Sequence, residues 1–134
     1  MHPNYQKADA LSAQIIGAAI EVHRIKGPGL IESIYEKCLL RELELRGIRA
    51  VSQLTVPIEY KGVTFEEPLR LDIYAEGCLI VENKVVETIL PVHRAQLLSY
   101  MRLLSAPVGL IFNFREPVLK NGMARLILSG ADQS

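Results

Sequence analysis

Apolar residues recur every three or four positions in three stretches of the chain, the spacing that places one apolar stripe along an α-helix. The first stretch covers residues 8–26, and Gly27-Pro28-Gly29 ends it. The second covers residues 30–46, and the third covers residues 92–105 with Pro91 at its first turn. We therefore predict three amphipathic helices.

Between the second and third helices the apolar period shortens to two, which is typical of strands. Residues 51–58 alternate imperfectly, and Lys61-Gly62 marks a turn before a second extended run, so the two runs read as a hairpin. Residues 69–75 alternate cleanly, and Glu76-Gly77 turns the chain into residues 78–86. This region is predicted to be a meander of three strands.

Two more strands are predicted after the third helix. Residues 108–114 form an apolar run, and Lys120-Asn121-Gly122 is a turn signal before residues 123–128. The tail, residues 130–134, is expected to fray.

The predicted order is α-α-β-β-β-α-β-β, with the helices segregated around a mixed sheet in an α/β (α+β) fold. A chain of 134 residues is the usual size of one domain. We predict a single domain whose core spans about residues 8–129.

The strand at residues 78–86 carries charges that a buried strand does not hold without compensation. Glu82 and Lys84 share one face, Asn83 lies on the other, and both faces are otherwise largely apolar. An uncompensated charge there costs on the order of several kcal/mol. The short turn at Glu76-Gly77 could set Asp72 beside Glu82.

Two adjacent carboxylates repel each other unless a divalent cation neutralises them, and oxygen ligands of this kind suit Mg²⁺ or Mn²⁺. The order of Asp72, Glu82 and Lys84 thus indicates a metal site. The alternative is that Glu82 and Lys84 form structural ion pairs.

Charge and composition restrict the partners. Fifteen basic residues balance fifteen acidic ones, which counts against tight nonspecific nucleic-acid binding but leaves room for a local patch or a bound cation. No apolar run reaches the length of about 18 residues that crosses a bilayer, and residues 1–7 lack a signal-peptide layout. We expect a cytoplasmic protein without a membrane partner, with Cys38 and Cys78 as buried thiols.

The array of Asp72 followed by Glu82-Asn83-Lys84 resembles the PD-(D/E)xK phosphodiesterase superfamily, in which an Asp and an ExK triplet on adjacent strands surround a divalent metal. More narrowly, residues 29–35, GLIESIY, resemble the GxxExxY signature of a family of small bacterial and archaeal proteins in that superfamily. The resemblance covers about residues 10–128 and implies a restriction-endonuclease-like core.

The resemblance also implies roles. Asp72, Glu82 and the Asn83 backbone carbonyl would bind Mg²⁺ or Mn²⁺, and Lys84 would orient or deprotonate the attacking water. The middle residue of the triplet is usually apolar in the family, so Asn83 is expected to make the back of its strand wetter.

The helices would contribute further groups. Glu32 would be a helix-borne acid near the metal, and Gln96 would support the lysine or the substrate phosphate. His93, Tyr100 and Tyr35 are candidate substrate contacts; the alternatives are a helix cap for His93 and core aromatic residues for the two tyrosines.

Three functions are compatible with these patterns. The first is a metal-dependent nuclease or phosphodiesterase that hydrolyses DNA or RNA. The second is a non-catalytic nucleic-acid- or protein-binding module that retains the fold. The third is self-association as a homodimer, because so small a domain has little room for a substrate cleft.

Overall fold

A five-stranded mixed sheet in the order β1-β4-β5-β6-β7 forms the centre of this computed structural model, which describes residues 1–134. The strands are β1 (Ala50–Val56), β4 (Leu69–Ala75), β5 (Leu79–Lys84), β6 (Val108–Asn113) and β7 (Met123–Ile127). β5 and β6 run parallel, and every other neighbouring pair is antiparallel. The predicted mixed sheet is confirmed.

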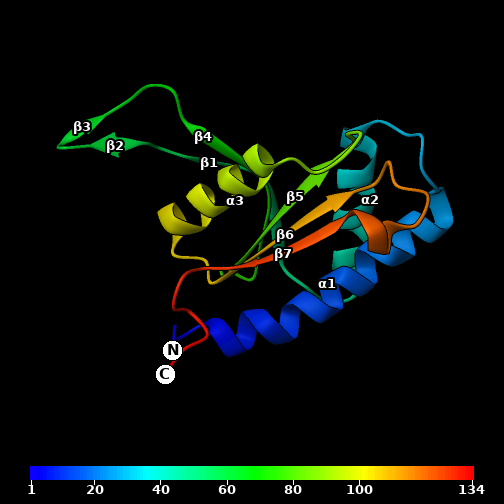
Figure 1. The fold of residues 1–134 in the computed structure, drawn as a ribbon, viewed down its shortest axis with the longest axis horizontal. Helices are drawn as coiled ribbons and strands as arrows, with labels where there is room; N and C mark the ends of the chain where they lie inside the picture. Colours follow the sequence, from blue (N-terminus) through cyan, green and yellow to red (C-terminus); the bar gives the residue numbers. More distant parts are fainter.

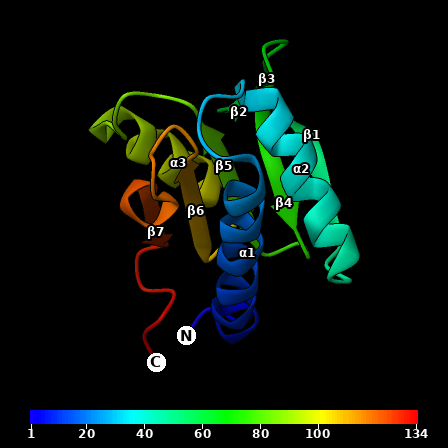
Figure 2. The ribbon, with the colours of Figure 1, turned by 90° about the vertical axis from the view of Figure 1, so that its right-hand side faces the viewer.

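Helices cover both faces of this sheet (Figures 1 and 2). Helices α1 (Tyr5–Lys26) and α2 (Glu32–Leu45) pack on one face over the larger apolar cluster. Helix α3 (Pro91–Leu104) packs on the other face over a smaller cluster. All three predicted helices are confirmed. The turn predicted at residues 120–122 lies within a short 3-10 helix, Leu119–Gly122. The sheet is buried on both sides, which explains the apolar runs of β5 and β6.

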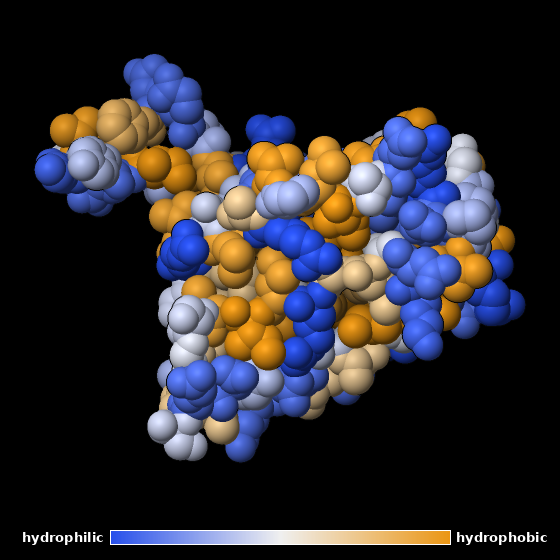
Figure 3. Space-filling model, viewed as in Figure 1, coloured by the Kyte–Doolittle hydropathy of each residue, from blue (hydrophilic) through white to orange (hydrophobic).

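The predicted three-strand meander is too simple. The segments on either side of Lys61-Gly62 leave the sheet as β2 (Glu59–Tyr60) and β3 (Val63–Thr64), which pair only with each other. Lys61 and Gly62 both adopt positive φ, as a tight hairpin turn requires. The resulting arm projects from the body of the molecule, and apolar side chains lie along it (Figures 1 and 3).

Strand β4 changes face at Asp72, although its sequence alternates cleanly. Leu71 packs with Ile80 in the cluster under α3, whereas Ile73 and Ala75 belong to the cluster under α1 and α2. Uniform alternation would place all three on one side. Asp72 therefore lies at a twist in the strand.

The tail was predicted to fray, and this was wrong. Ala131 is buried, and its carbonyl accepts a hydrogen bond of 2.8 Å from the His2 N–H. The N- and C-termini consequently lie together (Figure 1). None of the helices is both long and apolar enough to cross a lipid bilayer.

Helix α3 rests directly on the backbone of β6 at Gly109. A Cβ there would lie 2.7 Å from Met101 Sδ and 2.9 Å from Leu97 Cδ2. We predict that Gly109→Ala lowers the free energy of unfolding by about 1–3 kcal/mol through overpacking, measured by urea denaturation. Gly17→Ala is the control, because its Cβ meets only the end of the flexible Arg46 side chain, at 3.2 Å. Equal stability of Gly109→Ala and the wild type would contradict this packing.

Candidate active site

The β4–β5 hairpin brings Asp72 and Glu82 together. Its pairs run from Ala75↔Leu79 to Ile73↔Val81, and the same register places Asp72 opposite Glu82. At this level a side chain replaces backbone pairing: Asp72 Oδ2 accepts a 3.0 Å hydrogen bond from the Asn83 N–H, and the Asp72 carboxyl group lies within hydrogen-bonding reach of the Glu82 carboxyl group. The two carboxyl groups are thus in direct contact.

Burial makes this contact costly for Glu82, which is only 5% exposed. Loss of solvation is the largest effect on Glu82, the nearby charge of Asp72 adds to it, and together they raise its pKa to about 9 despite the opposing charge of Lys84. Glu82 Oε1 is buried without a hydrogen-bond partner. Without a cation, Glu82 therefore keeps its proton at neutral pH.

Helix α2 begins beside this pair. Glu32 is its first residue, and its carboxylate lies within hydrogen-bonding reach of the backbone of Val85, immediately after β5. Glu32 is exposed overall, and partial loss of solvation by its carboxyl group is the main cause that raises the pKa of Glu32; the charge of Asp72 raises it further, and Lys84 lowers it. The structure thus gathers Asp72, Glu82, Lys84 and Glu32 at the end of β5.

Helix α3 approaches the same carboxylates from the other face. Burial raises the pKa of the Tyr100 hydroxyl, and the charges of Glu82 and Asp72 raise it further, which places this hydroxyl close to both. The exposed Gln96 side chain lies within hydrogen-bonding reach of the Tyr100 hydroxyl. Gln96 and Tyr100 therefore form the α3 side of the site.

His93 serves as a helix cap, which was one of its two predicted roles. Its Nδ1 accepts a 2.9 Å hydrogen bond from the Leu90 N–H at the start of α3. The ring also lies near enough to Glu32 to lower the pKa of that carboxyl group. His93 thus borders the site from the first turn of α3.

Tyr35 is a structural residue, so the prediction of a substrate contact was wrong. Its side chain is fully buried and stacks on Phe114 with ring centroids 4.5 Å apart. The hydroxyl donates to the Gly27 carbonyl at 2.5 Å and accepts the Leu30 N–H at 3.1 Å. Tyr35 thereby holds the loop that leads into Glu32.

Asn83 also differs from expectation. It was expected to make the back of β5 wetter, but its side chain is completely buried on the face covered by α1 and α2, and neither amide atom has a hydrogen-bond partner. The two cysteines are both free thiols; Cys78 is buried, as predicted, whereas Cys38 is only partly buried.

Glu36 was missed by the sequence analysis. Burial is the main cause that raises its pKa, and the charges of Asp72 and Glu32 add to this effect, whereas a hydrogen bond from Gln53 opposes it. The spacing of the two acidic residues could have indicated it. Residues four apart share one face of a helix, and Glu36 follows Glu32 by four positions.

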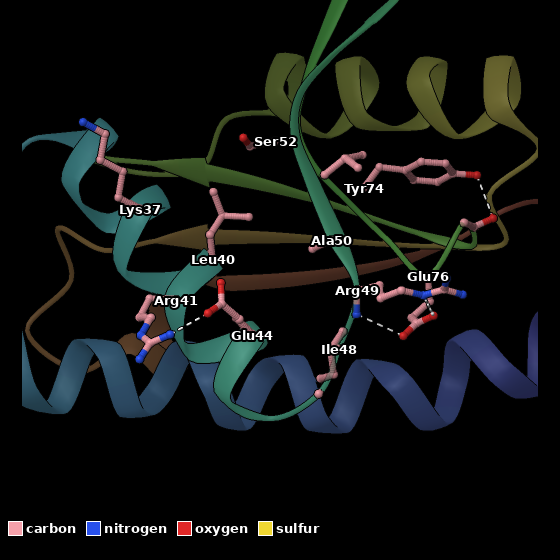
Figure 4. A pocket seen from close by; sticks show the side chains of 13 residues that line it. Lys37, Leu40, Arg41, Glu44, Ile48, Arg49, Ala50, Ser52, Tyr74 and Glu76 are labelled. Atoms are coloured by element: carbon pink, nitrogen blue, oxygen red, sulfur yellow. Dashed lines mark hydrogen bonds and ion pairs between the residues drawn. The ribbon is translucent and has the colours of Figure 1, made fainter.

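A large groove of the surface lies elsewhere. A groove of about 1150 Å³ runs between α2 and β1, and Figure 4 shows Arg41 and Arg49 within it paired with Glu44 and Glu76. None of the candidate site residues lines this groove. At the candidate site, Glu32 and Gln96 are exposed, Asp72 and Lys84 are partly exposed, and Glu82 is buried.

The model of a protein family described as the PD-(D/E)XK nuclease superfamily matches residues 9–126. The chain belongs to this superfamily. Among solved structures, the chain is similar to one titled "Crystal structure of SSO0001", with 19% sequence identity and a TM-score of 0.47. The match covers 70% of this chain and 47% of that one, so this chain spans about half its length. A comparison with curated proteins gives no match.

A PD-(D/E)XK nuclease fold raises the question of a divalent metal. No group of three or more His, Cys, Asp or Glu side chains is placed to hold one. The smaller set of Asp72 and Glu82 nevertheless fits a cation, because two contacting carboxyl groups and a partnerless Glu82 Oε1 leave oxygen ligands and negative charge uncompensated.

The raised pKa of Glu82 predicts a pH dependence of stability for the metal-free protein. Unfolded Glu82 ionises above about pH 4.5, whereas the folded group holds its proton to about pH 9. Between these values unfolding releases a proton, so stability falls as pH rises, by up to about 1.4 kcal/mol per pH unit. Glu82→Gln should remove this part of the slope.

Thermal melts in EDTA at pH 5.5, 7 and 8.5 would measure how the stability of each variant changes with pH. Glu87→Gln is the matched control, since Glu87 is exposed just beyond β5 and should retain the wild-type slope. If Glu82→Gln and the wild type lost stability equally between pH 5.5 and 8.5, the assignment of the proton to Glu82 would be wrong.

Proposed function

We propose that this protein is a divalent-metal-dependent phosphodiesterase that hydrolyses nucleic-acid phosphodiester bonds. The observation that carries the proposal is the contact of Asp72 with the buried Glu82, whose Oε1 has no partner, beside Lys84. A purely structural pair would be expected to satisfy its buried oxygens. Membership of the PD-(D/E)XK nuclease superfamily supports the same reading.

In this proposal Asp72, Glu82 and the Asn83 backbone carbonyl hold Mg²⁺ or Mn²⁺. When bound, the cation supplies Lewis acidity and lowers the pKa of its water. Side chains of the protein position the water and stabilise the charge that develops on the phosphate. Lys84, whose charge acts on both Glu82 and Glu32, orients the attacking water and stabilises negative charge on the phosphate. Glu32 is a further acid within the field of Asp72 and Lys84.

Helix α3 would face the substrate. Gln96 is exposed and can reach a phosphate oxygen while its hydrogen bond with the Tyr100 hydroxyl limits its orientation. His93 stands at the start of the same helix, with one ring nitrogen occupied by the cap. We assign the chain more narrowly to the GxxExxY family, supported by residues 29–35, whose Tyr35 holds the loop and whose Glu32 reaches β5.

Cleavage assays test the proposal. Purified protein is incubated with single- and double-stranded DNA and RNA, with Mg²⁺ or Mn²⁺ and with EDTA. Asp72→Asn and Lys84→Ala should each reduce cleavage by about a hundredfold or more, because each removes a group needed at the reacting phosphate. Glu87→Gln should cleave as the wild type does.

Two outcomes would count against catalysis. Cleavage that survives in the Asp72→Asn, Lys84→Ala double variant would belong to a contaminant. No cleavage by the wild type, together with thermal stabilisation by Mn²⁺ that Glu82→Ala abolishes, would favour the non-catalytic module, for which the zero net charge is the supporting observation.

Self-association is a separate proposal. The exposed apolar residues Tyr60, Val63 and Phe65 lie along the β2–β3 arm, and a lone two-stranded ribbon is marginally stable in water. Light scattering distinguishes a monomer from a homodimer.

A further inference from the structure

Gln53 has an unusual backbone inside a strand. Four non-glycine residues have positive φ, and three of them lie in hairpin turns or at a helix end: Lys61, Glu76 and Ser105. Gln53, with φ of 52°, lies in the middle of β1. A side chain makes this conformation unfavourable, so it persists only where the surrounding contacts enforce it.

The position of Gln53 is directly opposite Asp72. β1 and β4 pair in one register on both sides, at Ser52↔Ile73 and at Leu54↔Leu71, and the pair between them is missing. β1 changes face here as β4 does: Ala50 packs under α1 and α2, whereas Leu54 packs under α3. The distortion therefore belongs to the same twist that presents Asp72.

The Gln53 side chain connects this twist to α2. Its Nε2 donates to both carboxylate oxygens of Glu36, at 2.9 and 3.0 Å. No other side-chain hydrogen bond joins α2 to a strand of the sheet; the remaining ones are made within the helix, reach the loop before it or, from Arg46 just beyond its end, reach Gln14 of α1. The first two turns of α2 are thus tied to the sheet at one place, opposite Asp72.

Glu32 lies one turn before Glu36 on the same face of α2. Its carboxylate lies within hydrogen-bonding reach of the Val85 backbone and within the field of Asp72 and Lys84. A small rotation or shift of α2 would break the contact with Val85, because a hydrogen bond tolerates only a few tenths of an ångström and a limited angle.

We propose that Gln53 and Glu36 are positioning residues, which fix the first turns of α2 over Asp72 and thereby hold Glu32 against the end of β5. The positioning is a property of the folded, metal-free chain, and only its consequence for the reaction rests on the proposed function. Glu36 carries no ligand role in this inference.

Amide hydrogen exchange of Val85 measures the effect without metal or substrate. Gln53→Gly removes the side chain and accepts the positive φ, and Glu36→Ala removes the acceptor. Each should speed exchange of the Val85 amide by about tenfold, the scale of losing a hydrogen bond to a charged group, with core amides of β6 unchanged. Glu44→Ala is the control, because it breaks an ion pair within the same helix and should leave Val85 unchanged.

Dependence on Glu32 separates positioning from general stabilisation. Glu32→Ala should speed Val85 exchange by itself, and adding Gln53→Gly should speed it no further. Unchanged Val85 exchange in both single variants would overturn the inference, as would faster exchange across the whole sheet. If the wild type cleaves nucleic acid, Gln53→Gly should lower kcat and leave KM unchanged. The kcat of Gln53→Gly should not fall below the kcat of Glu32→Ala. If it does not cleave, the proposed function fails while the exchange result stands.

Discussion

The contact between the Asp72 and Glu82 carboxyl groups is the constraint on which the rest of the site depends. The tight turn at Glu76-Gly77, with both residues at positive φ, sets the register of β4 and β5 and thereby places the two residues opposite each other. Apolar packing on both faces of the sheet then removes the water that would screen them. Repulsion and burial together leave Glu82 holding a proton and one oxygen without a partner, a state that a divalent cation relieves.

The helices complete the site from opposite faces of the sheet. α2 brings Glu32 to the end of β5, and α3 brings Gln96 and Tyr100 to the same carboxylates. Each helix is held by features that touch no candidate reacting group: Tyr35 ties the loop before α2, and the missing side chain of Gly109 lets α3 lie directly on β6. Structural residues thus set the distances on which the proposed chemistry relies.

The site is also where the fold departs most from regular structure. β1 and β4 both change face at Gln53 and Asp72, and the β4–β5 ladder gives way to bonds between side chains and backbone. Such departures cost free energy and concentrate at functional sites. The completely buried Asn83 amide adds another cost, and no neighbouring group in the structure explains it.

Features formed by residues close together in the chain could be predicted from the amino-acid order. The period of the apolar residues predicts the helices, and the residue types at Glu76-Gly77 predict the turn. The register of this one short hairpin then predicts that Asp72 lies beside Glu82. Contacts between segments that are distant in the chain could be seen only in the folded structure. The burial of Tyr35, the docking of Ala131 against His2 and the bond from Gln53 to Glu36 each join elements whose approach no local pattern encodes. The twist at Asp72 could not be predicted for the same reason. The apolar and polar residues of β4 alternate regularly in the sequence, and only their packing against helices on opposite faces of the sheet shows that the strand changes face.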